Sequence, residues 1–247
     1  MIIRISRDAG ERYDDFSVDC SKEITVLDLL FHTQEKHDQS LAFRYSCRGA
    51  ICGSCAILVN GVPVLACRTP LARILDEDTA DMVTLTRGAT IPENGLLLEP
   101  LPKLPVLRDL VVDWEPFFDS YRNVDPVLKT ADTPPENEYL VFKDEAKDLE
   151  KYTNCILCAL CWSACPVVGE TEGYPGPAAL AKLYRFHLDS REPDGENRLK
   201  LADKDSGWWA CDFYKHCNKV CPKGVPPNIA IGKARGVLKR EGIQNEN

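Results

Sequence analysis

The chain has 247 residues, 12 cysteines and a net charge of -8, and 44% of its residues are hydrophobic. This length allows one large domain or two smaller ones, each with its own core. The cysteines are clustered and too few for a disulfide scaffold, so they indicate metal binding in a reducing compartment. The acidic balance argues against broad nucleic-acid binding. No apolar run reaches the roughly 18 residues of a spanning helix, and we expect no secretory signal at the N-terminus.

The first predicted elements are a hairpin and a helix. Ile2–Ser6 and Asp14–Cys20 have the pattern of two short strands. Thr25 is predicted to cap a helix that continues to about His37. Cys20 has no partner cysteine at a recognisable spacing, so it is interpreted as a buried structural thiol.

The next feature is a loop with the spacing CxxxxCxxC, which is that of plant-type 2Fe-2S ferredoxins. Its glycines, Gly49 and Gly53, allow backbone amides to turn toward a cluster. Two strands flanking the type I′ signal Asn60-Gly61 then return the chain with a fourth cysteine. Structural zinc is the alternative, but zinc sites favour two CxxC knuckles. The predicted 2Fe-2S ligands are Cys47, Cys52, Cys55 and Cys67.

A strand near Met82–Thr86 is expected to complete a small mixed sheet of β-grasp type. The segment from Thr90 to about Pro135 is rich in proline and reads as a connector that packs on a domain or another subunit. The predicted domains are a 2Fe-2S ferredoxin-like β-grasp domain (1–105), a proline-rich connector (106–135) and a helical cluster-binding domain (136–247). The predicted fold class is therefore α+β, with a plant-type ferredoxin domain followed by an all-helical, bacterial-ferredoxin-like domain.

Two further cysteine runs follow the bacterial ferredoxin pattern CxxCxxCxxxCP, in which the fourth cysteine ligates the other cluster of the pair. The run at Cys155–Pro166 is complete, whereas the run at Cys211–Pro222 has Tyr214 in place of its second cysteine. Crossed ligation therefore leaves one cluster with four thiolates, which fits 4Fe-4S, and the other with three, which predicts 3Fe-4S. The 4Fe-4S set is Cys155, Cys158, Cys161 and Cys221, and the 3Fe-4S set is Cys165, Cys211 and Cys217.

Helices are predicted to surround these runs, one starting at Pro177 and ending near Arg191–Pro193, another starting near Pro227. Three cluster sites use eleven of the twelve cysteines, and no Gly-rich phosphate loop for flavin or nicotinamide is present. The chain therefore supports one-electron transfer and leaves the substrate to a partner. Candidates to face a quinone lie near the 3Fe-4S ligands: Trp162, Asp212, Tyr214, His216 and Lys223.

The cysteine sets resemble those of the iron-sulfur subunits of succinate dehydrogenases and quinol:fumarate reductases, over nearly the whole chain. RDLVVDW at 108–114, GPAAL at 176–180 and CPKG at 221–224 also resemble this family. The resemblance implies an oxidoreductase subunit of the tricarboxylic acid cycle or of anaerobic respiration. Its partners would be a flavoprotein subunit with covalent FAD and a membrane-anchor subunit that binds quinone and can bind haem. This chain would lie peripherally on the cytoplasmic face of the cell membrane and would not bind the dicarboxylate.

Within the family, the residues around GPAAL and GWWAC are closer to the fumarate-reductase branch, which slightly favours fumarate reduction. Asp212 stands where many succinate dehydrogenases have a histidine. The resemblance also implies that Pro166 lies beside the quinone and that Arg235 is a basic position of the last helix. Two alternatives stay open: an iron-sulfur subunit of another flavoprotein dehydrogenase, and a zinc-stabilised adaptor without catalysis. A third alternative, the small 2Fe-2S subunit of molybdenum hydroxylases, is rejected because such subunits lack the CxxCxxCxxxCP run.

Overall fold

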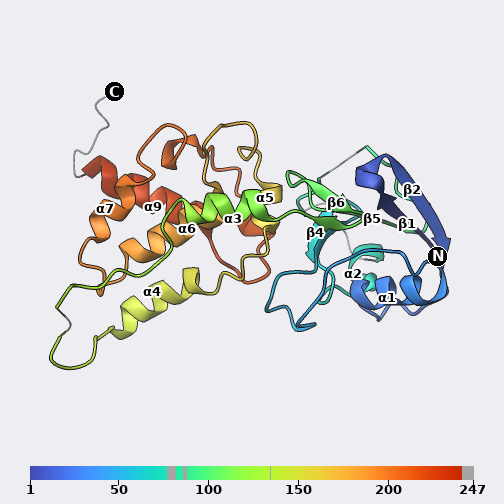
Figure 1. Ribbon diagram of the computed structural model, residues 1–247, viewed down its shortest axis with the longest axis horizontal. Helices are drawn as coiled ribbons and strands as arrows, with labels where there is room; N and C mark the ends of the chain where they lie inside the picture. Colours follow the sequence, from blue (N-terminus) through green and yellow to red (C-terminus); the bar gives the residue numbers. More distant parts are fainter. Residues whose placement is uncertain (77–81, 86–87, 134, 241–247) are drawn as a thin grey trace. The chain divides into compact units, whose positions relative to one another are not determined.

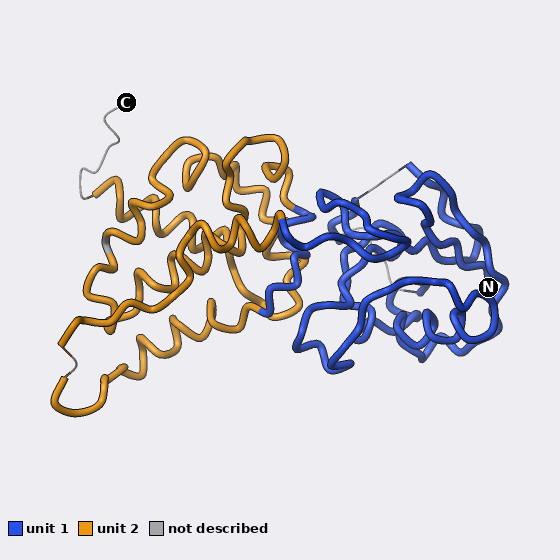
Figure 2. The backbone as a smooth tube through the Cα atoms, viewed as in Figure 1, with its two compact units in different colours: residues 1–115, 156–164 blue, residues 116–155, 165–247 orange. Residues whose placement is uncertain are grey.

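The structure is a computed structural model that describes residues 1–76, 82–85, 88–133 and 135–240 (Figure 1). It divides into two compact units, which are considered separately (Figure 2). Unit 1 comprises Met1–Glu115 and Ile156–Ala164, and unit 2 comprises Pro116–Cys155 and Cys165–Asn247. Parts of three sequence predictions lie outside the described residues: Thr86 of the expected strand, residue 134 of the connector and 241–247 of the helical domain.

Unit 1 is built on a five-stranded mixed sheet in the order β2-β1-β5-β3-β4. β1 and β5 are parallel, and the other neighbouring pairs are antiparallel. The side chains of β3, β4 and β5 are buried along their whole length and form the core with α1. The strands are β1 (Ile2–Arg7), β2 (Arg12–Ser17), β3 (Ala56–Val59), β4 (Val62–Leu65) and β5 (Leu96–Glu99), and the helices are η1 (Asp8–Gly10), α1 (Val26–Lys36), α2 (Leu71–Leu75) and α5 (Leu160–Ala164).

The predicted N-terminal hairpin and capped helix are confirmed, with small differences in their ends. β2 ends at Ser17 rather than at Cys20, and Cys20 is half-buried rather than buried. Thr25 accepts from the Asp28 amide and forms a capping box that starts α1. The turn at Asn60 and Gly61 has φ of 51° and 78°, as a type I′ hairpin requires.

The strand expected near Met82–Thr86 is a wrong prediction where the structure describes it. Residues 82–85 form no strand. The Leu85 amide donates a hydrogen bond to the Gly61 carbonyl in the hairpin turn at 2.8 Å. The sheet is completed instead by β5, whose Leu96, Leu97 and Leu98 are all buried. The prolines on both sides of β5 obscured it, because they made the whole segment resemble a connector.

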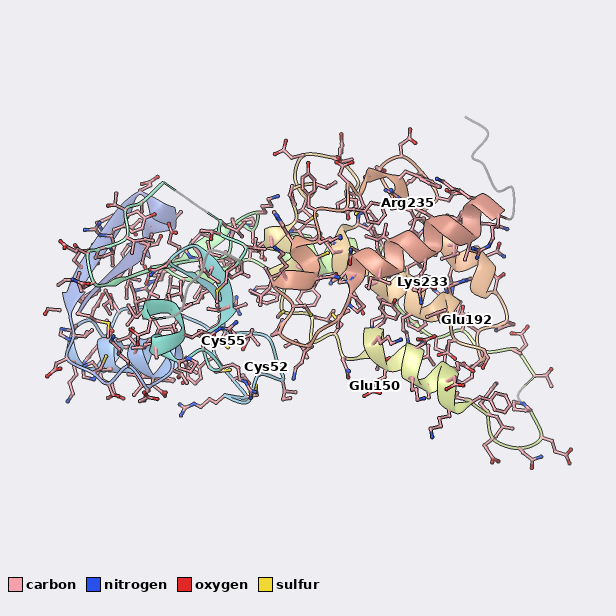
Figure 3. The ribbon with its side chains drawn as sticks, turned by 180° about the vertical axis from the view of Figure 1, so that it is seen from behind. Cys52, Cys55, Glu150, Glu192, Lys233 and Arg235 are labelled. Carbon is pink, nitrogen blue, oxygen red and sulfur yellow. The ribbon has the colours of Figure 1, made fainter. Side chains whose placement is uncertain are left out.

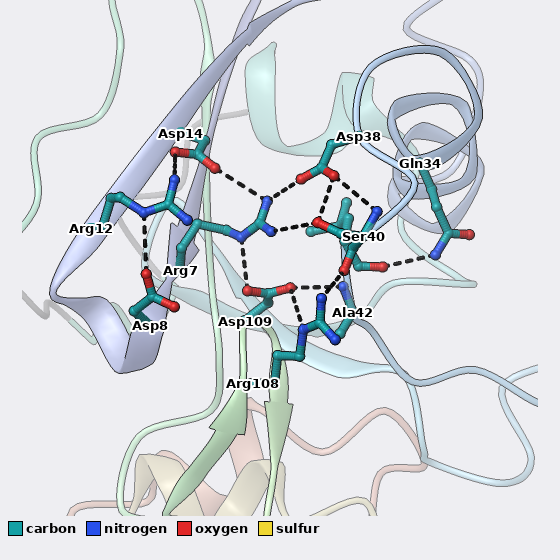
Figure 4. A network of polar contacts seen from close by, with 11 residues as sticks. Arg7, Asp8, Arg12, Asp14, Gln34, Asp38, Ser40, Ala42, Arg108 and Asp109 are labelled. Carbon is teal, nitrogen blue, oxygen red and sulfur yellow. Dashed lines mark hydrogen bonds and ion pairs between the residues drawn. The ribbon is translucent and has the colours of Figure 1, made fainter.

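A small hairpin of β6 (Val106–Arg108) and β7 (Val111–Val112) is tied to the rest of unit 1 by a buried polar network (Figure 4). Arg7, only 4% exposed, donates to Asp109 at 2.8 Å and to Asp38 at 2.5 Å. The second oxygen of Asp109 accepts from the Ala42 amide at 2.9 Å. Since a buried arginine must be paired, this network holds the segment at 38–42, which leads into the first cysteine loop.

Unit 2 is helical, and α6 is its central element, packed against α4, α7 and α9. Trp208 is completely buried, and its indole N–H donates to the Leu199 carbonyl at 2.7 Å. A buried ion pair joins Arg198 and Glu192 at 2.8 Å. The helices are α3 (Glu115–Arg122), α4 (Lys143–Thr153), α6 (Gly176–His187), α7 (Gly195–Lys200), η2 (Trp208–Ala210), α8 (His216–Lys219) and α9 (Pro227–Arg240).

Both predicted helix starts are confirmed, since α6 has Pro177 in its first turn and α9 begins at Pro227. α6 ends at His187, a few residues earlier than expected. The segment interpreted as a connector contains β6, β7 and α3, and the boundary between the units falls after Glu115. Among the described residues, no helix combines the length and the apolar character needed to cross a bilayer.

Candidate metal centres

The first cysteine loop directs backbone amides toward one sulfur. Three of its residues adopt the left-handed conformation: Arg48, Ala50 and Gly53, with φ of 53°, 56° and 74°. The resulting curl places three amides at 3.3 Å from Cys47 Sγ, those of Cys52, Gly49 and Ile51. These hydrogen bonds lower the pKa of Cys47 to about 6, because they stabilise its thiolate.

The opposite side of this site is buried. Cys55 is 4% exposed, and the β3–β4 hairpin returns the chain so that the Ala66 amide donates to the Cys55 carbonyl at 3.0 Å. Burial raises the pKa of Cys55 to about 12, and Cys67 beside it also raises it. Electrostatic contacts also link Cys55 with Cys52, whose sulfur lies 3.2 Å from Ser54 Oγ (Figure 3). The four cysteines predicted to bind 2Fe-2S are thus brought together in unit 1.

The second run approaches the first loop within unit 1. A Cβ added to Gly53 would lie 2.8 Å from Cys158 Cβ and 3.0 Å from the Ile156 carbonyl oxygen. Glycine is therefore required both by its positive φ and by this contact. The Trp162 indole of α5 donates to the Lys103 carbonyl at 3.3 Å, which anchors the run to unit 1.

The predicted 4Fe-4S ligands are divided between the units. Cys158 and Cys161 belong to unit 1, and Cys155 and Cys221 belong to unit 2. Their grouping around one cluster therefore stays a prediction. The Cys221 sulfur accepts a hydrogen bond from the Val225 amide at 3.3 Å.

The third run has the same backbone curl as the first. Phe213 and Lys215 have φ of 57° and 63°, and the Phe213 amide donates to Cys211 Sγ at 3.4 Å. Arg235 of α9 fixes the start of this run, since its guanidinium donates to the carbonyls of Trp208 at 2.7 Å and Cys211 at 2.8 Å. The same guanidinium lies 4.8 Å from the centroid of the Phe213 ring. Arg235 is labelled on α9 in Figure 3.

A cavity in unit 2 brings together the three cysteines predicted to bind 3Fe-4S. Cys165, Cys211 and Cys217 all line it. Burial raises the pKa of Cys217 to about 12 and raises that of Cys211 as well. Neutral thiols are favoured there until a positively charged group binds, so iron ions would offset the cost of burying the thiolates.

The residues predicted to lie near a quinone separate into two groups. Pro166, Tyr214 and His216 line this cavity. Asp212 is exposed and is not part of the lining, and Arg235 instead holds the two carbonyl groups described above. No contact with a quinone follows from these positions alone, so that role stays a prediction.

Two buried polar residues among those lining the cavity were missed by the sequence analysis. Tyr174 is 5% exposed and Asn228 is 7% exposed. Neither the Tyr174 hydroxyl nor the Asn228 Oδ1 has a hydrogen-bond partner among the described residues. Burial raises the pKa of Tyr174, and the neighbouring sulfurs, Cys165 first, raise it further. Neither residue belongs to a cysteine spacing, so only the fold associates them with the site.

These residues fit iron-sulfur clusters. Left-handed residues between the cysteines, which also include Leu157 and Ala159 in the second run, turn successive amides to one side and form concavities that bind anions. All twelve cysteines lie in the described residues and are thiols rather than disulfides. In the part of the chain that the structure describes, no three His, Cys, Asp or Glu side chains are grouped as a single metal ion requires. A cluster instead distributes its ligands over several irons.

Comparison with protein families gives two matches. A family described as a 2Fe-2S iron-sulfur cluster binding domain matches residues 1–119, and one described as a 4Fe-4S dicluster domain matches residues 151–225. Together with the sheet of unit 1 and the helices of unit 2, these matches confirm the predicted fold class. They also establish the 2Fe-2S and 4Fe-4S character of the two domains.

Curated proteins and solved structures extend the similarity to nearly the whole chain. The fumarate reductase iron-sulfur subunit of Mycobacterium tuberculosis is 35% identical over 238 residues, which are 94% of this chain and 90% of that protein. The mitochondrial succinate dehydrogenase [ubiquinone] iron-sulfur subunit 2 of Oryza sativa is 39% identical over 210 residues, 83% of this chain and 62% of that protein. A chain of the Mycobacterium smegmatis Sdh1 complex in the apo form has the same fold, with a TM-score of 0.83, 23% identity and coverage of 100% and 98%.

Proposed function

This chain belongs to the family of fumarate reductase and succinate dehydrogenase iron-sulfur subunits, and we propose that it relays electrons between an FAD-containing partner and quinone in a membrane anchor. As a member of this family it is a subunit of an oxidoreductase. The observation that carries the relay is the approach of Gly53 to Cys158, which joins the loop of the first centre to a predicted ligand of the second. Electron transfer between centres requires such proximity.

The proposed cofactors are three clusters with separate ligand sets. The 2Fe-2S cluster would be held by Cys47, Cys52, Cys55 and Cys67, the 4Fe-4S cluster by Cys155, Cys158, Cys161 and Cys221, and the 3Fe-4S cluster by Cys165, Cys211 and Cys217. When bound, these clusters supply one-electron redox chemistry. The protein contributes amide hydrogen bonds to Cys47 and Cys211 and a buried environment for Cys55 and Cys217. Such groups set the reduction potentials.

Partners and direction are also part of the proposal. The flavoprotein would act on fumarate or succinate, and the chain would attach to the cytoplasmic face of the membrane through the anchor. Quinone would approach the side of unit 2 where Pro166, Tyr214 and His216 line the cavity. Asp212, in the third cysteine run, and Arg235, on α9, are the other two residues proposed to lie near it. Relatives named for fumarate reductase and for succinate dehydrogenase match at 35% and 39% identity. We favour fumarate reduction from the residues around GPAAL and GWWAC.

The proposal is tested by purifying the native complex through a tag on this chain. We expect an FAD-containing subunit and a membrane subunit to co-purify, with about nine irons per chain from the three cluster types. Reduction of fumarate by a quinol and of quinone by succinate would be measured in both directions. Cys52→Ser should lose the 2Fe-2S paramagnetic signal, whereas Cys20→Ser, the matched control outside the ligand sets, should retain all signals. A colourless, zinc-containing preparation would refute the relay.

The three-iron assignment has its own test at Tyr214, which is exposed and lines the cavity where a fourth cysteine would stand in the ferredoxin pattern. Tyr214→Cys should allow a second 4Fe-4S cluster to form and should remove the signal of the oxidised 3Fe-4S cluster. Tyr214→Phe is the control, because it offers no ligand and should leave the signal intact. Unchanged iron content and an unchanged signal in Tyr214→Cys would contradict the ligand count.

A further inference from the structure

We propose that the hydroxyl group of Tyr174 donates a hydrogen bond to the cluster held by Cys165, Cys211 and Cys217, and thereby raises the reduction potential of that cluster. The inference rests on the proposed function, because it requires a cluster in the cavity that these cysteines line. It adds a residue that no cysteine motif contains. The role is one of tuning, since Tyr174 would keep its proton and bind no iron.

The first argument is the position of the hydroxyl. Tyr174 lines the cavity together with the three cysteines and is 5% exposed. Its oxygen is close enough to the Cys165 sulfur for that sulfur to raise the pKa of Tyr174, but it completes no hydrogen bond within the described residues. Buried hydroxyl groups in folded proteins are almost always paired, so an orphaned one beside a ligand cavity indicates that the ligand is its partner.

The second argument is that the backbone holds Tyr174 firmly in place. Its amide donates to the Thr171 carbonyl at 3.2 Å, and the carbonyl of the next residue, Pro175, accepts from Ser120 Oγ at 2.8 Å. Helix α6 begins directly afterwards at Gly176. The backbone on both sides of Tyr174 is therefore restrained, and because the side chain is buried, its hydroxyl has little access to water as a partner.

The chemistry of the cavity favours donation by Tyr174. Cluster sulfides and cysteine thiolates accept hydrogen bonds but have no proton to donate, whereas a phenol is a neutral donor. Asn228, whose Oδ1 also has no hydrogen-bond partner among the described residues, lines the same cavity. The lining of the cavity therefore contains buried polar groups besides its cysteines. Backbone amides already donate to Cys211 and Cys217, and Tyr174 would add a side-chain donor from a different segment.

The effect on the potential has a defined sign. On reduction the cluster gains one electron from its neighbouring centre and loses none, and no proton leaves Tyr174. A hydrogen bond from a neutral donor is stronger to the more negative form of the acceptor. The reduced form is therefore stabilised more than the oxidised form, and removing the hydroxyl should lower the potential.

The experiment is a redox titration of the purified complex, followed by the paramagnetic signal of the oxidised three-iron cluster. Tyr174→Phe should make the cluster about tenfold harder to reduce, which corresponds to a potential lower by about 59 mV for one electron. Tyr152→Phe is the matched control, because Tyr152 is 2% exposed in the same unit but does not line the cavity. The reduction potential of the three-iron cluster in Tyr152→Phe should equal that in the wild type. After exchange into D₂O, pulsed electron paramagnetic resonance of the three-iron cluster should also detect one coupled deuteron fewer in Tyr174→Phe than in the wild type.

Each outcome has a defined meaning. A three-iron signal with the same potential and the same deuteron couplings in wild type and Tyr174→Phe overturns the inference and leaves the proposed function intact. Absence of that signal in the wild type overturns both. If Tyr174→Phe does not retain the cluster, 3-fluorotyrosine incorporated at position 174 tests the inference instead, since it preserves the ring and its hydroxyl donates a stronger hydrogen bond. A raised potential then supports the inference, and an unchanged one overturns it.

Discussion

Replacing Gly53 by alanine tests the contact between the first cysteine loop and the second run. At φ of +74° a side chain costs about 1–2 kcal/mol. The new Cβ would also lie 2.8 Å from Cys158 Cβ and 2.9 Å from Cys158 Cα, well inside the roughly 3.5 Å of normal carbon contacts. Overpacking of this kind costs about 1–3 kcal/mol. The total is about 2–5 kcal/mol, unless the loop moves away from Cys158.

The assay is the urea concentration at which the visible absorbance of the clusters is lost, together with the paramagnetic signal of the 2Fe-2S cluster. With a denaturant slope of about 1–3 kcal/mol per M, the midpoint should fall by on the order of 1 M. Gly49→Ala is the matched control in the same loop. Gly49 lies outside the left-handed region, and its added Cβ would meet only the Cys47 carbonyl oxygen at 3.6 Å, an ordinary contact. Equal midpoints and equal signals for the two variants would refute the reasoning.

Two further predictions concern the polar network of unit 1. Asp109→Ala removes the most buried of the carboxylate partners of Arg7, which keeps Asp38, and should destabilise the chain by about 1–3 kcal/mol. Asp15→Ala breaks an exposed pair and should cost at most about 1 kcal/mol. Urea unfolding followed by circular dichroism compares the two variants, and equal losses would contradict the role of burial. Asp38 has a pKa lowered to about 2 by the Ser40 hydroxyl and Arg7, so its stabilisation is present above the unfolded pKa of about 3.9 and is lost as the pH falls toward 2. Asp38→Asn should therefore be less stable than wild type at pH 6 and approach it below pH ~3, and a stability difference independent of pH would count against this account.

Prediction from the sequence succeeded where chemistry depends on local spacing. The intervals between cysteines predicted the two iron-sulfur domains that the family comparisons confirm. Asn60-Gly61 predicted a turn whose dihedral angles depend on two residues only. It failed for β5, because a strand pairs with segments far away in sequence and its prolines signalled a break instead. The parallel pairing of Ile3 with Leu96 joins residues that are far apart in sequence, and no local pattern predicts it.

The sequence by itself determined the family and the fold class, since these follow from residue type and spacing along the chain, and it predicted which cysteines would serve each cluster. Only the tertiary structure decided what surrounds them. It brought Gly53 against Cys158, buried Arg7 beside Asp109, and placed Tyr174 in the lining of the cavity of Cys165. The physical reason is that hydrogen bonds, burial and close contact depend on distances in space between residues that are remote in sequence.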